Sequence, residues 1–265
     1  MDFIIYTDLD GTLLDHDTYS YLKATPALNE IKKKGIPLIF CTSKTRAEIE
    51  VYRRELSLKD PFISENGGAI FIPEGYFPKE EVGRVTGGYN VIELGTEYDK
   101  LRRVLDEIRS RVDCRIVGFG DMAPEELSRD CGISLGEAGL AKKREYDEAF
   151  RMEGTDEAIG EVLNLIKKSG FHYTKGGRYY HLMGENDKGK AVRILTDFYR
   201  KKYPEVKTIA LGDSGNDYPM LDNVDVPVLI KRPEGYAGFK RKGLIRSNRV
   251  GPAGWNDVVL DLIKK

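Results

Sequence analysis

The sequence is poor in the residues that build disulfides and zinc sites. Its 265 residues include 3 cysteines and 3 histidines. The cysteines do not have metal-ligand spacing, so they are expected to be reduced structural thiols. The histidines do not have the paired helical spacing of a zinc site, so no zinc is expected. These residues are Cys41, Cys114, Cys131, His16, His172 and His181.

Long apolar runs and an excess of one charge are also missing. No stretch is long enough to span a bilayer and the first residues lack a basic signal segment, so a cytoplasmic protein is expected. The 42 basic and 43 acidic residues leave a formal net charge of -1, which predicts binding to neither nucleic acid nor a membrane surface. Charged residues make up 32% of the chain, a content that would suit the surface ion pairs of a thermophile. The composition indicates no particular oligomeric state.

The sequence does contain a regular alternation of strand and helix patterns. Buried strands are predicted at residues 3–7 and 36–43, and helices at 25–34 and 45–56. A strand, a glycine-rich turn and a second strand are predicted within 61–73. This order is typical of a parallel sheet with helices on its faces.

A different pattern follows in the middle of the chain. Residues 84–183 mix strands and helices and end in a hairpin around Gly176 and Gly177. After this block the first pattern returns, with an amphipathic helix at 188–203 and a buried strand at 206–213.

These patterns predict an α/β fold with two domains. Residues 1–83 and 184–265 would form a Rossmann-like parallel-sheet core, and residues 84–183 an inserted α+β cap domain. At 265 residues the chain is near the size at which a second lobe becomes common.

Two carboxylates end the first predicted strand, in the segment Asp8-Leu9-Asp10-Gly11-Thr12. Residues two apart on a strand point the same way, so Asp8 and Asp10 can share a pocket at the edge where open parallel sheets bind ligands. Two carboxylates in one pocket repel each other unless a cation binds between them. Mg2+ is such a cation, because it prefers oxygen ligands. The alternative interpretation is an ordinary Asp-Gly turn or helix cap.

Three further polar segments lie at the ends of predicted elements. Ser43 and Lys44 follow the second strand, where they can hold phosphate oxygens or merely cap the next helix. Lys188 precedes a helix and can neutralise a phosphoryl group or remain an ordinary solvated lysine. Asp213 and Asp217 follow another strand, as ligands or as a capping turn. Because most of them fall at the carboxyl ends of strands, a shared site is favoured.

In this order, the segment at 8–12, the Ser43 turn, Lys188 and the segment at 212–217 resemble the four motifs of the haloacid dehalogenase superfamily phosphatases. The place of the inserted block resembles the members with a C2-type α/β cap. The segments at 64–73, 144–150 and 175–184 also resemble the mannosyl-3-phosphoglycerate phosphatases of that superfamily, and this likeness covers nearly the whole chain.

The resemblance implies hydrolysis of a phosphoric monoester in two steps. Asp8 would attack phosphorus to give an aspartyl-phosphate, and Asp10 would donate and then accept a proton. Ser43 and Lys188 would hold the phosphate oxygens. The cofactor would be Mg2+, with Asp10 contributing its backbone carbonyl and Asp217 orienting water or lysine. The residues assigned to the metal are Asp8, Asp10, Asp213 and Asp217.

The implied partner is a small phosphorylated sugar-glycerate, which carries a carboxylate and a hexose besides the phosphate. Arg144, Lys175 and Arg178 are candidates for the carboxylate, because cationic side chains grip it. Asp147 and Glu148 would accept hydrogen bonds from sugar hydroxyls. The full set of expected substrate contacts is Lys44, Glu65, Asn66, Gly67, Arg144, Asp147, Lys175, Gly176, Gly177, Arg178 and Asn216.

Other functions fit the same motifs. One is a C2-capped phosphatase for sucrose phosphate or glucosyl-3-phosphoglycerate; another is a phosphomutase. A third is a binding module that senses phosphosugars without turnover, although the intact Asp8 and Asp10 favour an enzyme. His181 is expected to be packed or hydrogen-bonded in its hairpin rather than catalytic.

Overall fold

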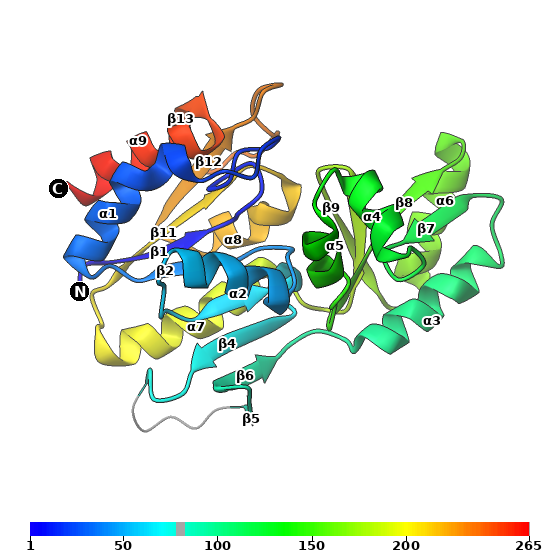
Figure 1. Ribbon diagram of the computed structural model, residues 1–265, viewed down its shortest axis with the longest axis horizontal. Helices are drawn as coiled ribbons and strands as arrows, with labels where there is room; N and C mark the ends of the chain where they lie inside the picture. The colour runs from blue at the N-terminus through cyan, green and yellow to red at the C-terminus, as the bar shows by residue number, and fades with distance from the viewer. Residues whose placement is uncertain (78–82, 265) are drawn as a thin grey trace.

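The larger lobe is built around a five-stranded parallel sheet (Figure 1). The computed structural model describes residues 1–77 and 83–264. In this part of the chain the strands lie in the order β13-β12-β11-β1-β2 and all pair in parallel. The predicted parallel-sheet core is therefore confirmed. The bounds are β1 Phe3–Thr7, β2 Leu38–Phe40, β11 Lys207–Gly212, β12 Val226–Lys231 and β13 Ile245–Val250.

Helices cover both faces of this sheet. Successive strand residues point to opposite faces. Ile5 and Leu211 accordingly pack with α1 and α9, whereas Ile4 and Ala210 pack with α7 and α8. The site-bearing strand ends are thus held in a sheet that is buried on both sides. The helices are α1 Thr25–Lys34, α7 Lys188–Lys202, α8 Tyr218–Asp222 and α9 Gly251–Ile263.

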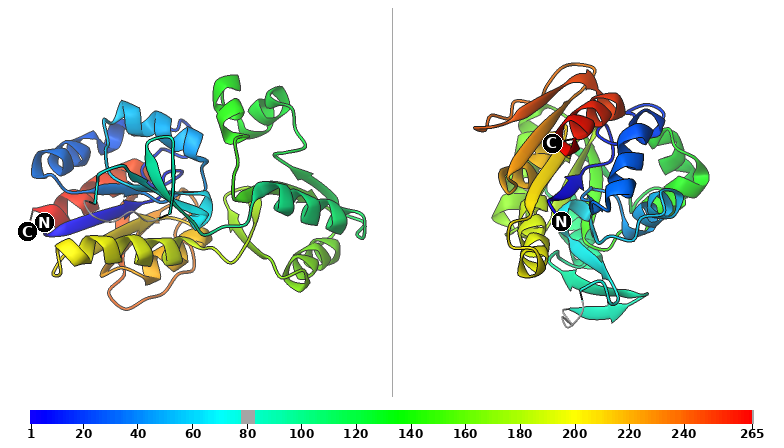
Figure 2. Two further views of the ribbon diagram at one scale, coloured as in Figure 1. Left: turned by 90° about the horizontal axis from the view of Figure 1, so that it is seen from below. Right: turned by 90° about the vertical axis from the view of Figure 1, so that its left-hand side faces the viewer.

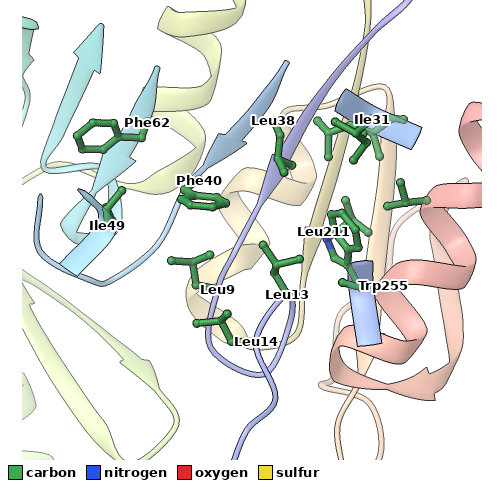
Figure 3. Close-up of a cluster of buried hydrophobic side chains, with 14 of the residues drawn as sticks. Leu9, Leu13, Leu14, Ile31, Leu38, Phe40, Ile49, Phe62, Leu211 and Trp255 are labelled. Atoms are coloured by element: carbon green, nitrogen blue, oxygen red, sulfur yellow. The ribbon is translucent and has the colours of Figure 1, made fainter. Parts of the chain in front are cut away.

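Trp255 of α9 anchors the end of β1 (Figure 3). Its side chain is fully buried in the apolar cluster that contains Leu13 and Leu211. Its Nε1 donates to Oγ1 of Thr7 at 3.0 Å, and this hydroxyl donates to the backbone carbonyl of Asp8 at 2.8 Å. The core therefore positions the residue at which the first strand ends.

A second, antiparallel sheet extends the larger lobe, in the order β3-β4-β6-β5. A parallel bridge between Cys41 and Ile63 places it beside β2. Its strands β5 and β6 lie within the stretch predicted as inserted, yet β6 pairs with β4. The boundary between 83 and 84 stays a prediction, and we propose from this pairing that the inserted part begins after β6. The bounds are β3 Phe62–Ser64, β4 Ala69–Pro73, β5 Arg84–Thr86 and β6 Tyr89–Glu93, with α2 at Arg46–Glu55.

The smaller lobe holds a third sheet, antiparallel, in the order β7-β8-β10-β9. Phe150 of β8 packs against α3 and α6 on one face, and Ala149 against α4 and α5 on the other. Figure 2 shows this lobe (green) beside the larger one, away from both chain ends. The bounds are β7 Arg115–Gly118, β8 Asp147–Glu153, β9 His172–Gly176, β10 Tyr179–Met183, α3 Tyr98–Arg109, α4 Pro124–Cys131, α5 Leu135–Ala141 and α6 Asp156–Lys168.

None of the helices in the described part of the chain is both long and apolar enough to span a bilayer.

Candidate active site

Four charged side chains from three of the four motifs meet at the carboxyl end of the central strands. Asp8 follows β1, Asp213 follows β11, Asp217 lies in the next turn, and Lys188 begins α7. The Nζ atom of Lys188 lies 2.8 Å from Oδ1 of Asp8 and 2.6 Å from Oδ1 of Asp217. Lys188 is completely buried. The interpretation of Lys188 as an ordinary solvated lysine is therefore wrong.

The three carboxylates of this cluster are close enough to share a cation. One oxygen each from Asp8, Asp213 and Asp217 lies within 4.8 Å of the others, and all three residues are buried. Burial, opposed mainly by Lys188, raises the pKa of Asp8 to about 7. Burial and the charge of Asp217 raise the pKa of Asp213 well above its usual value. A bound divalent cation would favour the ionised forms, and the all-oxygen donor set suits a hard ion.

Asp217 is the most fully engaged of the three. Its Oδ2 accepts the backbone N–H of Asp213 at 3.0 Å and of Ser214 at 3.1 Å, and its Oδ1 accepts from Lys188. Its two oxygens therefore already have three donors. This arrangement fits a residue that holds Lys188 in place, while direct metal ligation by Asp217 stays a prediction.

Asp213 keeps more of its acceptor capacity. Its Oδ1 accepts one hydrogen bond from Oγ1 of Thr12 at 3.1 Å. Gly11 has a φ of 74°, and a Cβ there would lie 3.0 Å from Oδ2 of Asp213. The glycine after the two acids thus allows both the sharp turn and the close approach of this carboxylate.

Asp10 lies at the more open side of the site. Its side chain is 39% exposed, whereas that of Asp8 is 7% exposed. Nζ of Lys44 lies 3.0 Å from Oδ1 of Asp10 and 3.5 Å from Oε1 of Glu48. Lys44 is therefore first an ion-pair partner of these two acids, and its contact with substrate stays a prediction.

A cleft of about 560 Å3 opens between the two lobes at this cluster. The larger lobe contributes Asp8, Asp10 and Asp213, and the smaller lobe contributes Arg178 and His181 among others. Further predicted site residues that line it are Ser43, Lys44, Arg144, Gly176, Gly177 and Asn216. The predicted site residues that are not among the described residues lining it are Lys188, Asp217, Glu65, Asn66, Gly67, Asp147 and Lys175.

The cleft is also lined by residues that the motifs did not indicate. Tyr19, Phe119, Tyr179 and Arg232 all line it. Arg232 follows β12 directly, so the rule that ligands bind at the carboxyl ends of parallel strands could have identified it. The three aromatic residues carry no such signal.

Glu65 joins the larger lobe to the start of β8. Its fully buried carboxylate accepts the backbone N–H of Glu145 at 3.0 Å, of Tyr146 at 2.8 Å and of Asp147 at 2.9 Å. Gly67, two residues on, has a φ of 87°, and a Cβ there would lie 2.2 Å from the carbonyl oxygen of Asp187. This turn connects the lobes, and its contact with substrate stays a prediction.

Arg144 lines the cleft, but its guanidinium is held by protein groups. The Nε atom donates to Oδ1 of Asp147 at 2.7 Å, and Nη2 donates to the carbonyl of Ser43 at 2.8 Å. The side chain is 3% exposed. Arg144 therefore links the smaller lobe to the turn that follows β2, and its predicted contact with a carboxylate remains untested.

Asp147 and Asn66 form a buried chain between the lobes. Oδ2 of Asp147 accepts from Nδ2 of Asn66 at 3.0 Å and lies 3.1 Å from Nδ1 of His181. Oδ1 of Asn66 accepts from Nδ2 of Asn216 at 3.0 Å. The chain thus runs from the turn after β11 to β10, and it occupies the Asp147 oxygens that were expected to bind a sugar.

The remaining candidates of the smaller lobe differ in their surroundings. Glu148 is fully buried and accepts from Tyr98 and Arg102, both at 2.6 Å, so it belongs to an internal ion pair. Nζ of Lys175 lies 4.8 Å from the ring centre of Tyr180. Arg178 is exposed and donates to two backbone carbonyls, at 3.1 and 3.0 Å, while it lines the cleft.

The fold and the site define an enzyme of the α/β class with its polar centre between two lobes. Residues 5–83 and 146–233 match the family of haloacid dehalogenase-like hydrolases. The match covers more than half of the chain, and the chain belongs to this family. It is a phosphoric monoester hydrolase, as the resemblance of the motifs predicted.

Similar proteins support this assignment. The chain is 55% identical to the glucosyl-3-phosphoglycerate/mannosyl-3-phosphoglycerate phosphatase of Methanococcoides burtonii, over 100% of this chain and 98% of the relative. It is 42% identical to the mannosyl-3-phosphoglycerate phosphatase of Pyrococcus furiosus, over 86% and 90%. The sucrose-phosphatase of Synechocystis shares the fold at a TM-score of 0.65 and 13% identity, over 99% of both chains.

Proposed function

We propose that the protein hydrolyses mannosyl-3-phosphoglycerate to mannosylglycerate and phosphate, and accepts the glucosyl compound as well, with Mg2+ as cofactor. The observation that carries the chemistry is the buried Lys188, which bridges Asp217 and Asp8, the latter lining the interlobe cleft. The relatives at 55% and 42% identity, named for these substrates, support the choice of substrate.

Asp8 is the proposed nucleophile. One carboxylate oxygen attacks phosphorus, the bond from phosphorus to the ester oxygen breaks, and an aspartyl-phosphate forms. In the second step water attacks phosphorus, the bond to the Asp8 oxygen breaks, and phosphate leaves. Only an ionised carboxylate attacks well, and the ammonium of Lys188 at 2.8 Å favours that form.

Asp10 is the proposed proton carrier. It donates a proton to the leaving alkoxide in the first step and takes one from the attacking water in the second. Both tasks require access to the cleft, which the partly exposed side chain of Asp10 has and the buried Asp217 lacks. Lys44 restrains Asp10 through the contact at 3.0 Å.

The residues present fit a divalent cation. Asp8 and Asp213 would hold it with carboxylate oxygens, and Asp10 with its backbone carbonyl. When bound, Mg2+ offsets the repulsion between the anionic nucleophile and the anionic phosphate. Asp217, whose oxygens already accept three hydrogen bonds, holds Lys188.

The cleft suits a ligand with a second anionic group and a sugar. Its volume of about 560 Å3 lies in the range typical of small-molecule sites. Arg178 and Arg232 line it from opposite lobes and can pair with the glycerate carboxylate. Gly176 and Gly177 allow the backbone of the hairpin to approach the substrate.

The test is phosphate release from mannosyl-3-phosphoglycerate, glucosyl-3-phosphoglycerate, sucrose phosphate and 3-phosphoglycerate, each with Mg2+ and with a chelator. The expected result is Mg2+-dependent release with kcat/KM highest for the two sugar-phosphoglycerates. Equal rates on all four esters would support phosphatase activity but contradict the proposed substrate preference. Faster release from sucrose phosphate would favour the second candidate substrate, and no release from any would contradict the proposed function.

A further inference from the structure

His181 is a polar side chain of the cleft that the proposed chemistry does not use. It lies on β10, is 6% exposed and lines the cleft. Its Nδ1 lies 3.1 Å from Oδ2 of Asp147. Within the described part of the chain, Nε2 of this ring accepts and donates no hydrogen bond. One ring nitrogen is thus held by the protein and the other is available.

The strand pattern directs His181 to the cleft. Tyr179 and His181 are two residues apart on β10, so both point to the same face of the sheet. His181 pairs in register with Ala149, and the backbone N–H of Phe119 donates to the carbonyl of Ala149 at 2.8 Å. Ala149, Phe119 and Tyr179 belong to one apolar cluster, and Phe119, Tyr179 and His181 all line the cleft. The neighbouring residues Tyr180 and Leu182 pack on the opposite face.

The partners of Asp147 determine which nitrogen of His181 carries the proton. Although burial acts in the opposite direction, the buried guanidinium of Arg144 lowers the pKa of Asp147, so its carboxyl is ionised and can only accept. Nδ1 of His181 must therefore be the donor in this contact. In the neutral imidazole the other nitrogen, Nε2, is then an acceptor.

An acceptor at this position needs a substrate group that can donate. A phosphate dianion and a carboxylate offer no proton at neutral pH, whereas each sugar hydroxyl does. We infer that His181 is a specificity-determining residue, whose Nε2 accepts a hydrogen bond from a hydroxyl of the substrate's hexose. This inference rests on the proposed function, because it requires a sugar-bearing substrate.

Asp147 and Asn66 act as positioning residues for His181. Asp147 receives hydrogen bonds from Arg144, Asn66 and His181, and Asn66 receives one from Asn216. Arg144, Asp147 and Asn66 are held by contacts with both lobes, and Asn216 lies in the turn after β11. The imidazole therefore cannot rotate without breaking its buried contact with Asp147. The ring is thereby fixed before substrate arrives, which lowers the entropic cost of forming the hydrogen bond.

The test compares His181→Asn with wild type. The asparagine amide can keep the hydrogen bond to Asp147 but has no atom at the position of Nε2. The KM for mannosyl-3-phosphoglycerate should rise about tenfold or more, because a hydroxyl loses its acceptor. The inhibition constant of 3-phosphoglycerate, which has no sugar, should stay within about twofold.

Two further variants serve as controls. His181→Gln extends an amide oxygen toward the place of Nε2 and should recover part of the KM. His172→Asn changes the exposed histidine of the same hairpin, which is absent from the cleft lining, and should alter neither constant.

Each outcome separates the two proposals. If wild type does not hydrolyse the sugar-phosphoglycerates, the proposed function fails and the inference fails with it. If wild type does and His181→Asn raises neither constant, or raises both equally, only the role of His181 is overturned. A selective rise in KM, partly recovered by glutamine, supports it.

Discussion

Replacing Lys188 with methionine should destabilise the protein even without substrate. Its ammonium lies 2.8 Å from Asp8 and 2.6 Å from Asp217, and all three side chains are buried. Methionine retains most of the length and packing of the side chain but removes its charge. Two buried carboxylates would then lose their shared counter-ion.

The structure sets the size of this effect. At an effective dielectric constant of about 20, each contact of Lys188 corresponds to an attraction of about 6 kcal/mol. Desolvation of the three charges offsets much of this, and the carboxylates can take up protons once the lysine is gone. Removing one partner of a buried ion pair costs about 3–5 kcal/mol. In a chain of this size that lowers Tm by about 6–20 °C.

Thermal unfolding followed by circular dichroism at neutral pH, with a chelator, measures this loss. Lys190→Met is the matched control, because Lys190 lies on the same helix and is half-buried but makes no ion pair with the residues that the structure describes. Its Tm should stay within about 2 °C of wild type. Without a counter-ion, the buried carboxylates have raised pKa values. The stability lost in Lys188→Met should therefore diminish as the pH falls and they become protonated.

A Tm of Lys188→Met within about 2 °C of wild type would refute this reasoning, because a buried bridge of this kind cannot be removed without cost. An equal loss in Lys190→Met would assign the effect to the helix rather than to the ion pairs.

Three other substitutions test the assigned roles. Asp8→Asn should leave the circular dichroism spectrum unchanged but abolish phosphate release from every ester; residual turnover would remove Asp8 as nucleophile. Asp213→Asn should raise the Mg2+ concentration for half-maximal activity about tenfold or more, and an unchanged titration would argue against ligation. Arg144→Met should lower the free energy of unfolding by about 3–5 kcal/mol, measured in urea, because Asp147 loses its buried partner. If Arg144 acts only through these protein contacts, KM in that variant should change alike for substrates with and without a carboxylate, whereas a selective rise for the carboxylate would support the predicted glycerate contact.

Elements with strong local signals were predictable from the sequence. Helix α2 begins after Thr45, whose hydroxyl accepts from the backbone of Glu48 while the Glu48 carboxylate accepts the N–H of Thr45. Helix α1 ends at Gly35, which has a φ of 62° that glycine adopts at little cost. Both boundaries come from contacts within four residues, so a sequence pattern contains them.

Two elements near the C-terminus lacked such signals. Strand β13 is an edge strand with mostly polar, exposed residues, and no apolar alternation marks it. Helix α9 begins at Gly251, four residues before the apolar pattern that starts at Trp255. Its first residues, Gly-Pro-Ala-Gly, have the composition of a loop, yet Gly251, Pro252 and Gly254 are all buried in the larger lobe. Tertiary packing, not local propensity, decides both cases.

The site was predictable where a local rule applied and not where partners are distant. Acids at strand ends identified Asp8 and Asp213. The partners of Glu65 are backbone amides about 80 positions later, which no side-chain pattern can indicate. Asp147 was expected to accept hydrogen bonds from sugar hydroxyls of the implied substrate, whereas in the structure it accepts from Arg144 and Asn66.

The central claim is that Asp8 becomes phosphorylated during turnover. The most direct measurement is rapid acid quenching of the enzyme while it turns over radiolabelled mannosyl-3-phosphoglycerate with Mg2+, followed by mapping of the labelled peptide. We expect label on the peptide that contains Asp8, and none in Asp8→Asn. Full turnover with no protein-bound label at the earliest times, or label on another residue, would contradict it.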